Sequence, residues 1–170
     1  MSIAIASIAA LSVAVFARPH NAKSTDEPST DFAVLQSSAR PDSKVLARLP
    51  DFVVLDTARL AYTDESGSYV AARSDRGEVC MAWLATAGGN YTSCQDFTEG
   101  FALHPPLVAI NAGGYGAGDR PRVLGLVPDF IDAVRLSDGQ NPEIKSNVFS
   151  VPAEGVTITV AGGTESWTLP

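Results

Sequence analysis

The chain has 170 residues, of which 45% are hydrophobic and 18% are charged, with a formal net charge of −7 and a pI of about 4.7. This length suits one domain, and the apolar fraction is sufficient for a folded core, which excludes a wholly disordered chain. The negative charge, without any cluster of basic residues, excludes a nucleic-acid-binding surface, because such surfaces attract phosphates through Lys and Arg.

The N-terminus carries an uncharged, mostly apolar run over residues 2–17. This run is shorter than the ~20 residues of a typical membrane-spanning helix and matches the apolar region of a signal peptide. The basic residues follow it instead of preceding it, which is the reverse of the usual pattern. We expect residues 1–17 to be a signal peptide or a membrane anchor, against the alternative of a buried helix, and to give the only membrane contact if uncleaved.

Residues 18–31 combine two prolines with many Ser, Thr, Asp and Glu residues, and they predict a flexible polar linker. A single β-rich domain is expected over residues 32–170. It begins with the apolar cluster FAVL at 32–35, which needs a surface to pack on.

One short helix is predicted near the start of this domain. Asp42 or Ser43 can cap a helix over residues 44–48, before Pro50 ends it. The stretch 51–62 has apolar residues at both helical and strand spacing, so the choice between helix and strand stays open there.

From residue 68 onward the sequence predicts β-strands joined by turns that contain glycine. Asp138-Gly139 is a hairpin signal. The strands are expected at 68–73, 78–85, 91–95, 107–112, 122–127, 132–137, 144–151, 156–160 and 166–169. Short strands at this spacing, without long helical segments, predict a mainly β fold, an antiparallel sandwich or an open barrel with one short N-terminal helix.

The only cysteines, Cys80 and Cys94, lie on the two predicted arms of one hairpin. Neighbouring antiparallel strands bring Cβ atoms within bridging distance, so we predict a disulfide, against the alternative of two reduced thiols. Two cysteines without partners do not form a metal site, and we expect no metal and no cofactor.

Three features are candidates for chemical sites. The glycine-rich loop over residues 111–122 lacks the helix start or Lys-Ser/Thr pair of a phosphate cradle, so we interpret it as a long hairpin loop whose Tyr115 could contact a partner. His104 could serve as the base of a hydrolase, although the sequence has no G-x-S-x-G motif. Asp129, Asp132 and Asp138, with Asn141 and Glu143, supply oxygen ligands for calcium without the spacing of a calcium loop.

Several segments resemble a family of uncharacterised short secreted or envelope β-rich proteins of actinobacteria. The resemblance spans nearly all of residues 32–151, through FAVL, YVAARSDRGEVCMAWL, GGNYTSC, GLVPDFIDAVRLSDG and NVF. It implies an envelope location and a paired-cysteine β domain, and it implies no activity. In such proteins a basic cluster usually precedes the apolar N-terminal run, and this chain departs from that pattern.

Together these observations predict a non-catalytic extracytoplasmic module that binds or senses a component of the cell envelope. Its partner would be an envelope protein or a small ligand. The alternative is a secreted hydrolase that uses His104 as its base.

Overall fold

The computed structural model describes residues 31–98, 105–112, 121–152 and 156–169. The predicted β class is confirmed, because the described residues form three antiparallel sheets that do not close into a barrel. The elements are α1 (Ala33–Gln36), α2 (Ser43–Leu46), β1 (Val53–Asp64), β2 (Gly67–Ser74), β3 (Val79–Ala85), β4 (Gly89–Gln95), β5 (Val108–Ala112), β6 (Arg122–Leu126), β7 (Ala133–Leu136), β8 (Val148–Pro152), β9 (Ile158–Gly162) and β10 (Glu165–Leu169).

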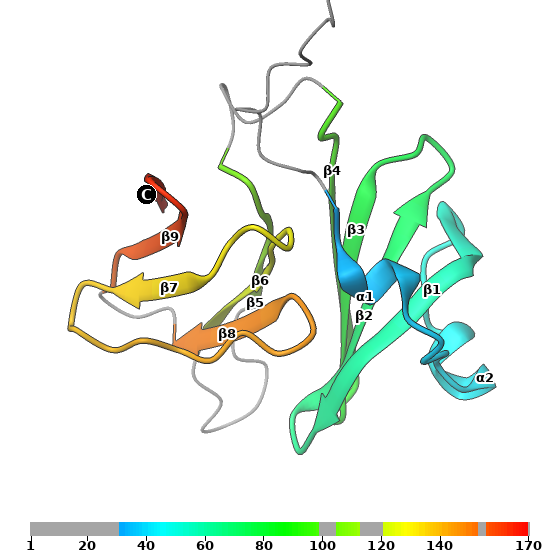
Figure 1. The fold of residues 1–170 in the computed structure, drawn as a ribbon. Coiled ribbons are helices and arrows are strands. Elements are labelled where there is room, and N and C mark those ends of the chain that lie inside the picture. The colour runs from blue at the N-terminus through cyan, green and yellow to red at the C-terminus, as the bar shows by residue number, and fades with distance from the viewer. Residues whose placement is uncertain (1–30, 99–104, 113–120, 153–155, 170) are drawn as a thin grey trace, which may run out of the picture.

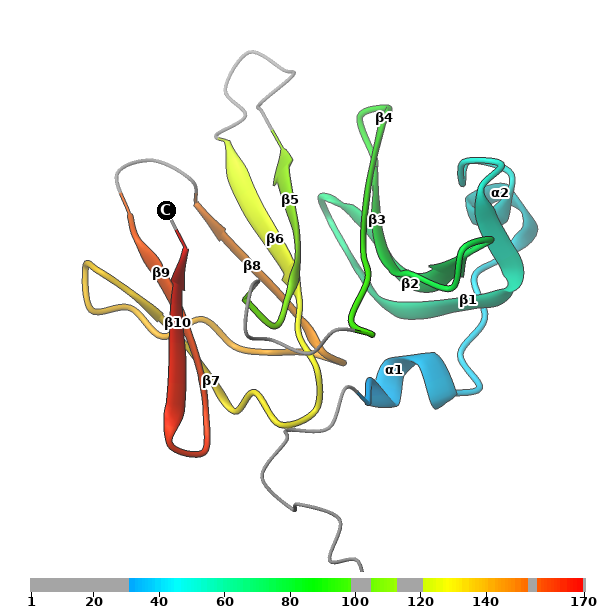
Figure 2. The same cartoon turned by 90° about the horizontal axis from the view of Figure 1, so that it is seen from above.

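The sheets are arranged as layers, with the middle layer covered on both sides (Figures 1 and 2). Sheet 1 has the strand order β1-β2-β3-β4, sheet 2 the order β5-β6-β8, and sheet 3 the order β10-β9-β7. One buried cluster joins side chains of sheets 1 and 2, and a second joins side chains of sheets 2 and 3. Sheet 2 is therefore the centre of the molecule.

Strand β6 shows why sheet 2 takes this position. Successive side chains of a strand point to opposite faces. Leu124 and Leu126 pack toward sheet 1, while Val123 and the residue after the strand, Val127, pack toward sheet 3. A strand buried on both faces has a nearly continuous apolar sequence, and Arg122–Leu126 fits this rule. Complete burial of a leucine side chain contributes about 1.5–3 kcal/mol.

The outer face of sheet 1 is covered by α2 and the residues that follow it. Val70 and Leu84 on this face form a third buried cluster with Leu49, and Leu46 of the helix packs against it. The predicted cap is confirmed, because the Val45 N–H donates to Asp42 Oδ1 over 2.9 Å.

The end of this helical segment is fastened to the β3–β4 turn. Arg48 donates to the carbonyl oxygens of Ala85 and Gly89 and to Asn90 Oδ1, while Asn90 Nδ2 donates to the Arg48 carbonyl oxygen over 2.8 Å. These paired contacts hold the helical segment across the outer face of sheet 1.

The structure differs from the sequence-based predictions at two places and decides the one choice that was left open. Residues 33–36 form a second short helix, and the open stretch 51–62 is mostly strand β1. The hairpin predicted at Asp138-Gly139 is wrong. Gly139 does turn the chain, with φ of +88°, but β7 pairs with β9 and β8 pairs with β6. A turn signal is local, whereas the pairing of a strand depends on which faces it can bury.

Asn147 ties helix α1 to the end of sheet 2. Its Oδ1 accepts the Val34 N–H over 2.9 Å, and its Nδ2 donates to the Val127 carbonyl oxygen and to Asp129 Oδ1. Its φ of +67° lies in the left-handed region, which Asn tolerates better than most residues.

We predict that Asn147→Ala lowers the free energy of unfolding by about 2 kcal/mol, since three hydrogen bonds are lost and the backbone becomes strained. Urea denaturation measures this change. The control is Asn141→Ala, at an exposed position without these contacts, which should stay within about 0.5 kcal/mol of the parent. Equal stability of the two variants would contradict the role given to Asn147.

Candidate functional site

The two cysteines form a disulfide between β3 and β4, as predicted. Cys80 and Cys94 are directly opposite in the register of these strands, with their Cα atoms 4.0 Å apart. Cys80 is only 1% exposed, whereas Cys94 is half-buried on the strand that ends sheet 1. A disulfide indicates an oxidising, extracytoplasmic environment.

A hollow of about 310 Å³ opens beside this disulfide. It is lined by Phe52, Asp75, Arg76, Glu78 and Cys94. Cys94 therefore contributes to the wall of a surface hollow that combines an aromatic residue, charged residues of both signs and a disulfide-bonded cysteine.

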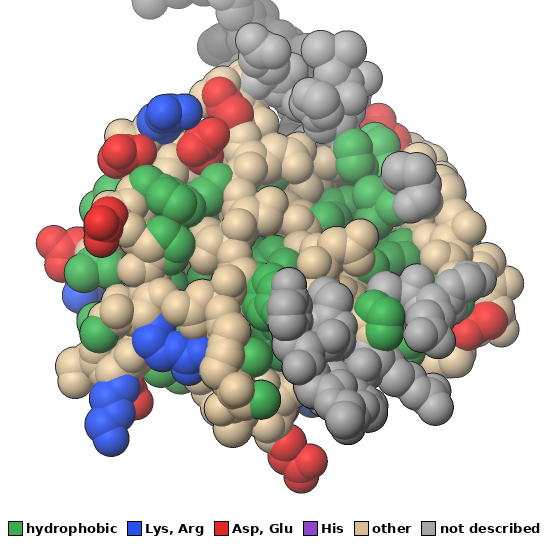
Figure 3. Space-filling model, turned by 180° about the vertical axis from the view of Figure 1, so that it is seen from behind, with side chains coloured by type: hydrophobic (Ala, Val, Ile, Leu, Met, Phe, Trp, Pro, Cys, Tyr) green, Lys and Arg blue, Asp and Glu red, His purple; other side chains and the backbone are tan. Residues whose placement is uncertain are grey.

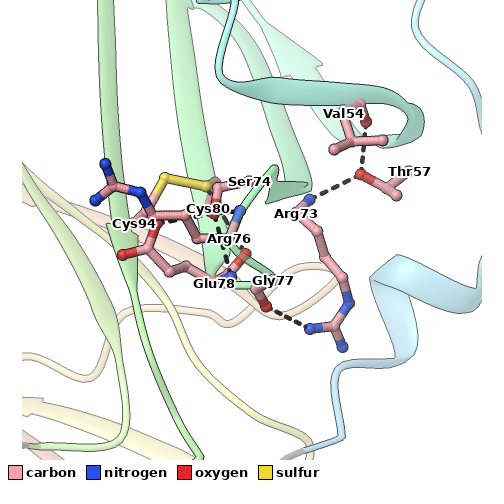
Figure 4. Close-up of a disulfide and its surroundings, with 9 residues drawn as sticks. All are labelled: Val54, Thr57, Arg73, Ser74, Arg76, Gly77, Glu78, Cys80 and Cys94. Carbon is pink, nitrogen blue, oxygen red and sulfur yellow. Dashed lines mark hydrogen bonds between the residues drawn. A yellow bond between two sulfur atoms is a disulfide. The ribbon is translucent and has the colours of Figure 1, made fainter.

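The β2–β3 turn positions the charged side chains of the hollow. Ser74 Oγ accepts the N–H groups of Arg76 and Glu78 and donates to Glu78 Oε2 over 2.8 Å. Gly77 follows with φ of +84°, a conformation that favours glycine. Figure 4 shows the Arg76 guanidinium on the Cys94 side of the disulfide, whereas the Arg73 guanidinium points away and donates to the Gly77 carbonyl oxygen.

Exposed apolar side chains lie on the segment that enters β1 next to this hollow. Phe52, Val54 and Leu55 are 44%, 39% and 48% exposed, and they are the large hydrophobic residues with high exposure among the described positions. The backbone bulges here, between Val54 and Arg59. Figure 3 shows one face of the molecule, on which hydrophobic side chains reach the surface between acidic and basic ones.

Thr57 closes the bulge. Its Oγ1 donates to the Val54 carbonyl oxygen over 2.7 Å and accepts the Arg73 N–H over 2.8 Å (Figure 4). A side chain thus replaces ladder bonds that the extra residues interrupt, and the apolar segment stays in a defined conformation.

The calcium candidates do not form one cluster of acidic ligands in the described structure. Asp132 and Asn141 line a hollow of about 600 Å³ beside β7, together with Arg135. Asp129 Oδ1 accepts the Ala33 N–H, and the Asp138 carboxylate accepts both the backbone and the side-chain N–H of Gln140. Within the described ranges, no group of three or more His, Cys, Asp or Glu residues could hold a metal ion.

Several predicted features lie outside the described residues. These are His104, Tyr115, the apolar run 2–17 and nearly all of the linker 18–31. The hydrolase hypothesis and the membrane-anchor hypothesis therefore stay predictions. Across the part of the chain that is described, no helix is long and apolar enough to cross a membrane.

An aromatic row that the sequence analysis missed crosses all four strands of sheet 1. Tyr62, Tyr69, Trp83 and Tyr91 come from β1, β2, β3 and β4, with ring centroids 4.2, 6.4 and 5.3 Å apart. The two predicted hairpins put Tyr69, Trp83 and Tyr91 opposite one another, so the signal was present. Such cross-strand aromatic pairs stabilise a sheet, each by up to about 1 kcal/mol.

Tyr62, at the β1 end of this row, has Asp64 and Arg122 as charged neighbours. Burial, followed by the neighbouring Tyr69, raises the pKa of Tyr62 well above its usual value, and Arg122 partly opposes this shift. Tyr62 is therefore neutral at physiological pH.

Trp83 Nε1 is buried without a hydrogen-bond partner in the described structure, and a Cβ on Gly67 would lie 2.8 Å from it.

The β1–β2 turn is built on Asp64. Its Oδ1 accepts hydrogen bonds from Ser66 N, Ser66 Oγ and Gly67 N, and its Oδ2 accepts from the Tyr69 hydroxyl. Partial burial raises the pKa of Asp64, but these hydrogen bonds together lower it by more. The pKa therefore lies below its ordinary value.

Three comparisons with known proteins gave no match. No family model, no curated protein and no solved structure matches it. The resemblance to actinobacterial envelope proteins stays a prediction.

We predict that replacing both cysteines, Cys80→Ala with Cys94→Ala, lowers the free energy of unfolding by about 3 kcal/mol, because the bond closes a loop of about 15 residues in the unfolded chain. Urea denaturation of the parent with and without a reducing agent provides the control. The reduced parent should match the double variant, and an unchanged stability after reduction would contradict the prediction.

A second prediction concerns pH. Because the pKa of Asp64 is lower in the folded chain, its contribution to stability is present at neutral pH and is lost as pH falls below about 4. We expect Asp64→Asn to reduce the difference in unfolding free energy between pH 7 and pH 3 by less than about 1 kcal/mol, since the group is largely exposed. Glu65→Gln, one residue away, is the matched control and should leave that difference unchanged. An identical pH dependence in both variants would refute the assignment.

Proposed function

We propose that this chain is a non-catalytic binding module of an extracytoplasmic compartment, exported or anchored through residues 1–17. The Cys80–Cys94 disulfide supports the location, because thiols persist in the cytosol and are oxidised outside it. The apolar run that precedes the domain in the sequence agrees with export or anchoring.

The observation that carries the binding role is the exposure of three large apolar side chains, Phe52, Val54 and Leu55, within four residues of the chain. Leaving such side chains in water costs free energy that a partner surface would recover, at about 25 cal/mol per Å² of apolar area. Val54 and Leu55 lie at a bulge that Thr57 closes, and the Phe52 carbonyl oxygen accepts the Asp75 N–H, so little conformational entropy is lost when a partner packs on them.

The partner we propose is another protein of the cell envelope. Protein interfaces concentrate their affinity in a few large apolar side chains surrounded by polar ones. Here Asp51 precedes the apolar segment and Asp75 lines the adjoining hollow, and both are exposed, whereas Asp56 is paired with Arg40. A partner surface with an apolar centre and basic residues around it would complement this arrangement.

Site-specific photo-crosslinking in the native host tests this proposal. We expect a photoreactive residue at position 55 to give a discrete crosslinked band in the extracytoplasmic fraction, because Leu55 would lie in the interface. Position 168 is the matched control, since Thr168 is exposed on the edge strand β10 of sheet 3. The same bands from both positions, or none from position 55, would contradict the proposal.

A further inference from the structure

We propose that the Cys80–Cys94 disulfide is an exchange site for a dithiol oxidoreductase of the thioredoxin type, which attacks at Cys94. This inference goes beyond the binding role and does not depend on the partner proposed above. It depends on the hollow at Cys94 and on the unequal exposure of the two sulfur-bearing residues.

Access distinguishes the two cysteines. Cys80 lies on β3, an inner strand with β2 on one side and β4 on the other, and is 1% exposed. Its register neighbour on β2 is Ala72, which is also buried. Cys94 lies on the strand that ends sheet 1, is half-buried and lines the 310 Å³ hollow. An external thiolate can therefore reach Cys94 Sγ in the folded chain, whereas it reaches Cys80 Sγ only after β4 opens.

The hollow supplies surroundings that suit an incoming thiolate. Phe52 provides an apolar wall, and the Arg76 guanidinium lies on the Cys94 side of the disulfide (Figure 4). Asp75 and Glu78 also line the hollow, but the Glu78 carboxylate accepts the Ser74 hydroxyl, which holds it toward the turn. Arg76 forms no ion pair with another described residue, so its charge remains available to attract an anion.

The exchange balances without another reactant. A thiolate of the oxidoreductase attacks Cys94 Sγ and forms a mixed disulfide, the Cys80–Cys94 bond breaks, and its electron pair leaves on Cys80 Sγ, which then takes a proton. The Glu78 carbonyl oxygen is 3.9 Å from Cys80 Sγ and can accept a hydrogen bond from the new thiol.

The second thiolate of the oxidoreductase completes the transfer. It attacks the oxidoreductase sulfur of the mixed disulfide, and Cys94 leaves as a thiolate and is protonated. The oxidoreductase becomes a disulfide, and this chain gains two electrons and two protons. In the opposite direction, Cys94 is the first thiol of the folded chain to be oxidised and Cys80 closes the bond.

The test uses the full chain in its oxidised form with a thioredoxin variant whose second active-site cysteine is replaced by serine. After acid quenching, peptide mass mapping identifies the residue joined to thioredoxin. We expect the mixed disulfide at Cys94. A bond at Cys80, or a mixed disulfide that forms only in urea at concentrations that unfold the chain, would overturn the proposal.

Rates provide a second readout with a matched pair of variants. With intact thioredoxin, its reductase and NADPH, we expect Arg76→Gln to slow reduction of the disulfide about 3- to 10-fold, and high salt to reduce this difference. Arg73→Gln removes the same charge from a guanidinium that points away from the disulfide, and it should react at nearly the parent rate. Equal rates for the two variants would overturn the role of Arg76 and the exchange site with it. The assay contains only the purified chain, thioredoxin, its reductase and NADPH, so its result does not depend on whether the proposed envelope partner exists.

Discussion

Strand β4 lies between the rest of sheet 1 and sheet 2, and its disulfide to β3 adds a covalent bond to the ladder that pairs the two strands. None of its residues is fully buried. Its main apolar contact is Tyr91, which stacks on Trp83 and packs against the cluster between sheets 1 and 2. The covalent bond at Cys94 contributes about 3 kcal/mol, which is a large part of a typical domain stability of about 5–15 kcal/mol.

The remaining structure follows from the need to cover sheet 2 on both faces. Sheet 1 covers one face and sheet 3 the other, so two separate clusters of apolar side chains meet at one sheet. Gly125 in the middle of β6 shows how close this packing is, because a Cβ there would collide with the ring of Phe149 on the neighbouring strand. The outer face of sheet 1 needs a cover of its own, which α2 and Leu49 supply.

The sequence predicted the parts of this fold that local patterns determine. Glycine turns and alternating residues located the β2–β3 and β3–β4 hairpins, and these hairpins placed Cys80 opposite Cys94. The pairing of β7 with β9 was not predictable in this way, because it depends on which strands bury Val134 and Val160 together. The Asp138-Gly139 turn is correct locally and says nothing about the partner of the next strand.

In the candidate site, too, the locally determined part could be predicted from the sequence and the part that depends on distant segments could not. The disulfide could be predicted from a hairpin, but the hollow beside it brings Phe52 from the start of β1 to Arg76 and Cys94. The position of Phe52 depends on the hydrogen bond from the Asp75 N–H to the Phe52 carbonyl oxygen. It also depends on the bulge in β1, which no short sequence motif predicts. Most of the aromatic row is the opposite case, since Tyr69, Trp83 and Tyr91 lie on the two hairpins that the sequence predicts.

The account depends most on the state of the two cysteines in the cell. The direct measurement is the intact mass of native protein that has been treated with a thiol-alkylating reagent during lysis of the host. The account predicts an unlabelled chain with two hydrogens fewer than the reduced form. A chain that carries the label on both Cys80 and Cys94 would contradict both the oxidising location and the covalent attachment of β4.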